Sequence, residues 1–179
     1  MTPHASQGYT VGLQWSNPVG SVSTPAAVRL QAEFTNLEQT AAFPGHVTTD
    51  YYTGRATAHG FTHRGQLLGA AIGPGASSQF IAGDYLASGW RAGLLAGRTR
   101  TENDAMYRMP DPRATRHDVT IYAGIRGAMR ASWSDISAEL VAGRRFNYLF
   151  QSEVYNAGGF GNSIDMSNVT LSLSFTPIR

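Results

Sequence analysis

The stretch DVTIYAGIRGAMRASW, residues 118–133, alternates between two kinds of side chain. One set is mostly apolar: Val119, Ile121, Ala123, Ile125, Gly127, Met129, Ala131 and Trp133. The other is mostly polar or small: Asp118, Thr120, Tyr122, Gly124, Arg126, Ala128, Arg130 and Ser132. Because successive side chains of a β-strand point to opposite faces, this period predicts one strand of about 14 residues. Globular strands usually have about 5–6 residues, whereas a strand that crosses a membrane needs about 9–11.

The same alternation recurs along the chain and predicts about eight strands. The further predicted strands are 9–16, 28–35, 47–57, 78–88, 90–101, 138–150 and 169–175, of which 47–57 has the weakest pattern. Arg144 interrupts the apolar face of 138–150, which indicates a bulge or a contact with another protein. No segment of useful length shows a helical period with caps, so the chain is expected to be nearly all strand and loop.

The links between the predicted strands alternate in length. Short links are expected at 18–24, near 88–89 and near 134–135, and a moderate one at 39–46. Long links are expected at 58–77, 102–116 and 151–166. Outer-membrane barrels have short periplasmic turns and long outer loops, so this alternation favours such a barrel.

The composition excludes several classes of function. The chain has 179 residues without cysteine, so disulfides, thiolate zinc sites and cysteine nucleophiles are excluded. The net charge is +2 and the 14 basic residues, all arginine, form no cluster, which gives nucleic-acid binding little support. No apolar run approaches the ~18 residues of a membrane-spanning helix, and the first residues lack the pattern of a signal peptide. The chain is therefore expected to be cytosolic, a mature form or a fragment of a longer protein.

The polar face distinguishes a membrane barrel from a soluble one. A soluble β-sandwich or lipocalin-like barrel exposes lysine and glutamate, whereas this face carries small polar residues and isolated charges of both signs. Such charges could pair across a wet interior: Arg29, Glu33, Arg126, Arg130, Glu139 and Arg145. Aromatic residues near strand ends suit interfacial girdles: Trp15, Trp90, Trp133, Tyr148, Phe150 and Phe175. The sequence thus predicts one all-β domain over 1–179, an antiparallel up-and-down transmembrane β-barrel of about eight strands or part of a larger barrel.

Residues 52–86, YTGRATAHGFTHRGQLLGAAIGPGASSQFIAGDYL, contain a distinctive glycine spacing. The residues that carry it are Gly60, Phe61, His63, Gly65, Leu68, Gly69 and Gly73. This block resembles the conserved block of the capsule assembly Wzi family of outer-membrane proteins. AELVAGRRFNYLF and NVTLSLSFTP are similar to the last two strands of that family. Ala70 departs from it, because the family often has histidine there, and family members are much longer.

The resemblance implies the C-terminal barrel portion of a longer bacterial outer-membrane protein, with a lectin-like and non-enzymatic role in capsular or other surface polysaccharide assembly or attachment. It implies surface polysaccharide and outer-membrane lipid as partners. His59 and His63, together with His46, could suggest a metal site, but this region is glycine-rich and not helical, so no metal and no cofactor is expected. Sugars bind through aromatic stacking and planar hydrogen-bonding groups, which the long loops supply. The candidate polysaccharide-binding residues are His63, Arg64, Tyr107, Arg108, Arg113, Tyr155, Asn156 and Phe160.

The sequence is also compatible with other functions. A lipid A-modifying barrel enzyme could use His59 or His63 with Ser77 or Ser78, although no nucleophile elbow is present. A small porin would also have a polar lumen, and a soluble ligand-binding β-barrel would show similar alternation. The glycines of 65–75 precede no Gly-Lys-Ser/Thr, so they are expected to serve tight turns or a bulge rather than a phosphate loop.

Overall fold

The computed structural model describes residues 8–38, 62–63, 66–67, 69–108, 116–150 and 165–178. The long strands are β1 (Tyr9–Pro18), β2 (Ala26–Asn36), β5 (Ser77–Ala87), β6 (Trp90–Arg100), β7 (Val119–Arg130), β8 (Ser134–Phe146) and β9 (Met166–Pro177). The short elements are β3 (Thr62–His63), β4 (Gln66–Leu67), the helix α1 (Asn103–Arg108) and the 3-10 turn η1 (Tyr148–Phe150).

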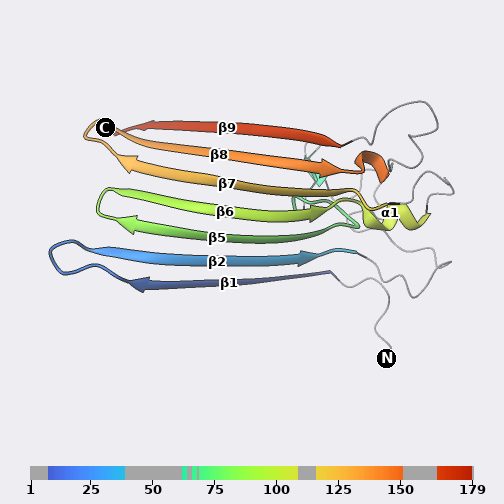
Figure 1. The fold of residues 1–179 in the computed structure, drawn as a ribbon, viewed down its shortest axis with the longest axis horizontal. Helices are drawn as coiled ribbons and strands as arrows, with labels where there is room; N and C mark the ends of the chain where they lie inside the picture. The colour runs from blue at the N-terminus through green and yellow to red at the C-terminus, as the bar shows by residue number, and fades with distance from the viewer. Residues whose placement is uncertain are drawn as a thin grey trace.

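The seven long strands form one antiparallel sheet in the order β1-β2-β5-β6-β7-β8-β9 (Figure 1). Every long strand therefore pairs with its neighbours in the chain, which confirms the predicted all-β, up-and-down arrangement. Within the described residues the sheet is open, because β1 pairs only with β2 and β9 only with β8. The predicted strand 47–57 lies outside the described residues.

The two ends of the sheet differ in the length of their connections (Figure 1). The links 19–25, 88–89 and 131–133 lie at one end, which we call the turn end. The strand ends that are joined by the links 37–76, 101–118 and 147–165 lie at the other end, which we call the loop end. In the sequence, β3, β4, α1 and η1 belong to these links. The predicted segregation of short and long links is thus confirmed. Among the described residues, no helix is long and apolar enough to cross a membrane.

The strand β8 ends earlier than its alternation predicts. Asn147 has a positive φ of 53°, a left-handed conformation that leaves the extended path, and the chain then enters η1. The prediction that the strand continues to Phe150 was therefore wrong. The interpretation of Arg144 as a bulge was also wrong, because the pairing of β8 with β7 and β9 runs through it without interruption. Arg144 instead bonds to Asp165, with an Nη2–Oδ2 distance of 3.0 Å.

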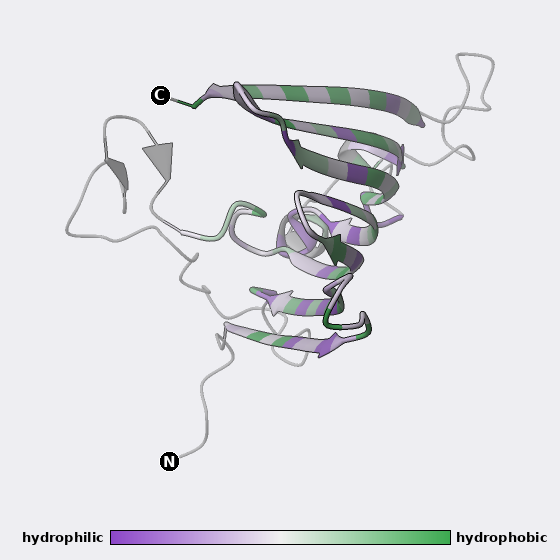
Figure 2. Ribbon diagram, turned by 90° about the vertical axis from the view of Figure 1, so that its left-hand side faces the viewer, coloured by the Kyte–Doolittle hydropathy of each residue, from purple (hydrophilic) through white to green (hydrophobic). Residues whose placement is uncertain are grey.

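The apolar side of this sheet is exposed to solvent and the polar side is less exposed, which is the reverse of the pattern in a soluble β-protein. On β7 and β8 the apolar positions are exposed and the intervening positions are less exposed, in strict alternation over most of each strand. Leu94 is 66% exposed and Leu171 62%, whereas Asp84 is 3% exposed. Figure 2 shows hydrophobic and hydrophilic bands alternating along the strands. We call the apolar side the outer face and the other side the inner face.

Few apolar side chains in the described part are buried. They are Leu37, Ala76, Ala82, Leu95 and Phe150. The residues that would normally form a core lie on the outer face instead, so this sheet does not bury its apolar surface against a second layer of its own described residues.

Candidate functional site

A row of polar residues crosses the whole inner face. In register, one residue from each strand in sheet order, it contains Ser16, Arg29, Asp84, Gly93, Arg126, Glu139 and Ser172. Its central charges alternate in sign, apart from the glycine of β6. We call this row the ionic row.

Asp84 of β5 is the centre of the ionic row. Its carboxylate, 1% exposed, accepts hydrogen bonds from Arg29 Nη2 at 2.8 Å and from Arg126 Nε and Nη2 at 2.8 and 2.7 Å. Two guanidinium groups therefore share one carboxylate. Their hydrogen bonds replace those that the carboxylate oxygens of Asp84 would make with water if they were exposed. The arrangement ties together β2, β5 and β7.

Gly93 makes this contact geometrically possible. Arg126 and Asp84 lie two strands apart, and Gly93 of the intervening strand β6 stands between them in register. A Cβ at Gly93 would collide with Asp84 Oδ1 and would lie 2.7 Å from the carbonyl oxygen of Gly83. Only glycine leaves room for the side chains to meet over β6.

The network continues to the edge strand β1. Arg126 Nη2 donates to Gln31 Oε1 at 2.9 Å, and Gln31 Nε2 donates to Gln14 Oε1 at 3.1 Å. Gly97, a second glycine of β6, leaves room for the Tyr122 side chain of β7, because a Cβ at Gly97 would collide with the Tyr122 ring. Two glycines on the inner face of β6 thus accommodate the two long side chains of β7.

Two further ion pairs lie at the loop end. Arg145 donates from Nε and Nη2 to the Asp118 carboxylate, each at 2.7 Å, and its guanidinium lies 4.6 Å from the centroid of the Tyr148 ring. Arg100 pairs with Glu38, which also accepts a bond from Asn103 Nδ2 at 3.2 Å. These contacts anchor the chain where the long links leave the sheet.

His117 lies beside these pairs, before β7. Burial lowers its pKa below the usual 6.5, the positive charge of Arg100 acts in the same direction, and the negative charge of Glu38 opposes them. The imidazole is therefore neutral at pH 7.

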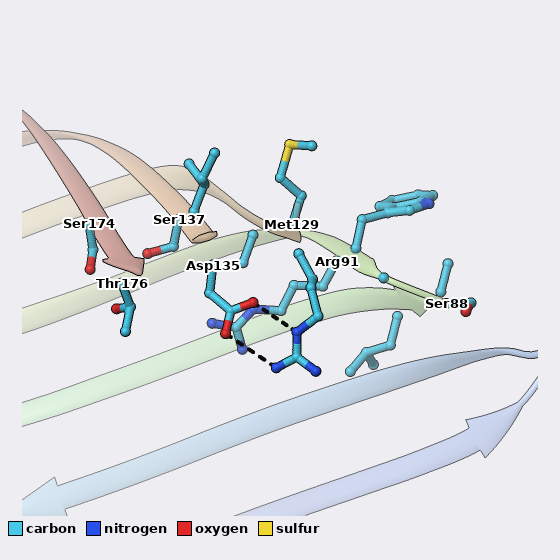
Figure 3. A pocket seen from close by; sticks show the side chains of 14 residues that line it. Ser88, Arg91, Met129, Asp135, Ser137, Ser174 and Thr176 are labelled. Carbon is cyan, nitrogen blue, oxygen red and sulfur yellow. Dashed lines mark hydrogen bonds and ion pairs between the residues drawn. The ribbon is translucent and has the colours of Figure 1, made fainter. Parts of the chain in front are cut away.

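At the turn end the inner face contains a cleft of about 690 Å³. Its lining includes Arg91, Ser137, Ser174 and Thr176, and Asp135, which is ion-paired to Arg130 at 2.9 Å (Figure 3). The Arg130 and Asp135 side chains are 71% and 44% exposed, so this pair contributes little stability.

All the interior charges predicted from sequence lie on the inner face. Arg29 and Arg126 meet at Asp84, Arg145 pairs with Asp118, and Glu139 stands beside Arg126 in register. Glu33 lies on the same side of β2 as Arg29 and is exposed. Arg130 lies at the turn end of this face, where it pairs with Asp135 and is mostly exposed. Asp84 and Gly93 were not predicted from the sequence as functional residues. Both residues do lie on the polar side of predicted strands, Asp84 in 78–88 and Gly93 in 90–101, but the alternation of these two strands is weak.

The candidate polysaccharide-binding residues are not tested by the geometry. Arg64, Arg113, Tyr155, Asn156 and Phe160 lie outside the described residues. For His63 in β3, and for Tyr107 and Arg108 in α1, only the backbone is described. His46 and His59 also lie outside. In the described part, no three metal-ligating side chains form a group.

No family model, characterised protein or solved structure matches this chain. The resemblance to the capsule assembly family therefore stays a prediction that rests on the residues quoted above.

Proposed function

We propose that this chain is part of a transmembrane β-barrel in a bacterial outer membrane. In this arrangement the outer face contacts acyl chains and the inner face encloses water and the ionic row. The observation that carries the proposal is the inverted exposure of the two faces, with Leu94, Ile125 and Leu171 exposed while Asp84 is buried. In water, such an outer face would be a large unprotected apolar patch.

The apolar positions are continuous across strands. The register row at the middle of the outer face contains Trp15, Leu30, Gly83, Leu94, Ile125, Leu140 and Leu171. A shallow hollow of about 810 Å³ is lined in part by Leu30, Leu94, Ile125 and Leu140, and such a surface suits hydrocarbon chains. A soluble lipocalin-like barrel would place these residues inside.

The outer face also has polar and aromatic boundaries. Arg98 and Arg144 lie on it near the loop end, and Trp90, Trp133 and Phe175 lie near the turn end. From Arg98 to Trp90 is about 27 Å along the strand, which at the roughly 35–45° tilt of outer-membrane strands spans about 19–22 Å of bilayer height, close to their roughly 25 Å apolar band. Aromatic side chains are favoured at membrane interfaces.

We further propose that the protein helps to hold capsular or other surface polysaccharide without catalysing a reaction. The resemblance of residues 52–86, 138–150 and 168–177 to the capsule assembly family supports this role, and the long links join strand ends at one end of the sheet, which agrees with a surface-binding end. The ion pairs of Asp84 with Arg29 and Arg126 tie three strands together, which supports a structural role for this face.

Adjacent tryptophans on β9 test the membrane proposal. With Trp15, Trp90 and Trp133 replaced by phenylalanine, Leu171→Trp and Ser172→Trp place one indole on the outer and one on the inner face. In vesicles containing lipids brominated on their acyl chains, we expect strong quenching of the fluorescence of the Leu171→Trp variant and weak quenching of the Ser172→Trp variant. Equal quenching in both would contradict a lipid-facing outer surface.

Loop replacement tests the polysaccharide role. Links 102–116 and 151–166 are shortened to Gly-Ser turns in the bacterium, and cell-bound and released polysaccharide are measured. We expect release to increase while the protein remains in the outer membrane, whereas shortening the turn-end link 19–25 should leave it unchanged. Unchanged retention after loop replacement would rule out binding by these loops.

A further inference from the structure

On the outer face of the described strands, charge occurs only near the loop end. The charged residues at outer positions of the seven long strands are Arg98, Arg100 and Arg144. The carboxylates of these strands occupy inner positions: Glu33, Asp84, Asp135 and Glu139. Arg100 is already paired with Glu38 of the adjoining link. The apolar outer face of the described sheet therefore ends in cations on one side only.

The other two arginines keep donors that no carboxylate occupies. Arg98 donates from Nη1 to the neutral Gln79 Oε1 at 3.1 Å, and in the described part of the chain it has no carboxylate partner. Arg144 pairs with Asp165 through Nη2 at 3.0 Å, and its side chain is 58% exposed. A guanidinium group has five N–H donors, so most of those of Arg144 can reach a further acceptor.

Arg98 and Arg144 belong to the same register row of the outer face. In sheet order the row contains Gln79, Arg98, Ile121, Arg144 and Ser167. Neighbouring strands lie about 4.8 Å apart, so the backbones at the two arginines are about 10 Å apart. Ile121 between them is 52% exposed. The long stems of the arginines allow both guanidinium groups to approach one anion placed over Ile121.

The shallow apolar hollow of the outer face lies directly beside this row. Its lining includes Ala96, Ala123 and Ala142, which stand in register two residues, or about 7 Å, from the arginine row. Leu94 and Ile125 line it farther from the loop end. A molecule with an acyl chain in the hollow would thus place an attached anionic group at the arginines.

Building on the membrane role proposed above, we propose that Arg98 and Arg144 bind a phosphate monoester of a glycolipid of the lipid A kind, one acyl chain of which lies in the hollow. Arginine forms strong charge-assisted hydrogen bonds with phosphate. A phosphate monoester carries about −1.5 to −2 charges at pH 7, so it suits two guanidinium groups better than the singly charged phosphodiester of a phospholipid. The long links of outer-membrane barrels are extracellular, so the row lies in the leaflet that contains this glycolipid.

Binding of lipid A to the full chain in detergent micelles, measured by native mass spectrometry, tests this inference. We expect Arg98→Gln and Arg144→Gln each to weaken binding on the order of 10-fold, the effect of losing one charged hydrogen-bond donor. Arg91→Gln is the matched control, because Arg91 belongs to the same strand as Arg98 but lies on the inner face at the turn end. This control should bind lipid A as the unchanged chain does.

Gln79→Ala separates charge from packing, because it removes the present hydrogen-bond partner of Arg98 and keeps the guanidinium group. We expect lipid A binding to be unchanged in this variant. A loss as large as that of Arg98→Gln would overturn the proposal, since local packing would then explain both results.

Changes to the lipid test the chemistry of the ligand. Lipid A without its phosphates is expected to bind on the order of 10-fold more weakly or less, and equal binding would overturn a phosphate site. Phosphatidylglycerol that binds as tightly as lipid A would overturn the assignment to a phosphate monoester. Quenching of Leu171→Trp by brominated acyl chains, together with no effect of phosphate removal, would leave the membrane role in place and refute this site alone.

Discussion

Glycines on the inner face of β6 show how single residues shape this surface. Gly93 and Gly97 lack the Cβ atoms that would meet Asp84 and Tyr122. Since β6 lies between β5 and β7, the absence of these side chains allows residues two strands apart to touch. The ionic row therefore requires glycine at position 93 as well as the charges of Asp84 and Arg126.

Gly93→Ala is expected to destabilise the sheet by about 2 kcal/mol, because the new methyl group must displace Asp84 or the backbone of Gly83. The midpoint of urea unfolding in micelles measures this effect. Gly127→Ala is the matched control, because its Cβ would meet only the Arg91 carbonyl oxygen, at an ordinary 3.5 Å. A loss of stability equal in the two variants would contradict the role given to Gly93.

His117 gives the loop end a dependence on pH. Its pKa is lower in the folded than in the unfolded state, so the folded state binds fewer protons. Stability from this residue is complete above about pH 6.5 and is lost as the pH falls through the lowered folded pKa. We expect His117→Gln to reduce the loss of stability between pH 7.5 and 5, as measured by urea unfolding at each pH. An unchanged pH profile would show that other groups control it.

At the scale of the element, each strand presents apolar side chains on the outer face and mostly small or polar side chains on the inner face. On β9 every second residue from Val169 to Phe175 is exposed and apolar, and the residues between them are small and polar. A single strand of this kind is not stable in water; in the proposed barrel it pairs with β8 and its apolar side contacts lipid.

A charge on each face of β9 tests this division. Leu171→Arg is expected to weaken folding into lipid vesicles by about 2–4 kcal/mol, the cost of a cation near the middle of the bilayer. Ser172→Arg, one residue away on the inner face, should cost less than about 1 kcal/mol because it can reach water. Urea titration in vesicles measures both, and equal costs would be inconsistent with a membrane-facing side.

At the scale of the whole molecule, the sheet formed by the described residues has a large apolar face and two open edges. In buffer without detergent, residues 1–179 are therefore expected to associate, and to become monodisperse in detergent micelles. Sedimentation velocity distinguishes the two states. A stable monomer in plain buffer would mean that the outer face is covered by parts of this chain.

Alternation in the sequence determined the strands and the grouping of residues on each face, because the two-residue period is a local property of an extended backbone. It therefore predicted that Arg29, Arg126 and Glu139 lie on the same face of the sheet, and that the long links join strand ends at one end of the sheet. It could not predict the ends of β8, since the left-handed Asn147 is held by Asp165 and by the carbonyl oxygen of His117, both distant in sequence.

Strand pairing in the folded protein determines which residues of different strands lie side by side. Register is a non-local property, and it places Gly93 between Asp84 and Arg126 and so creates the ionic row. The sequence alone determined which side chains of each strand share a face, whereas strand pairing determined which of them meet and which edges remain open.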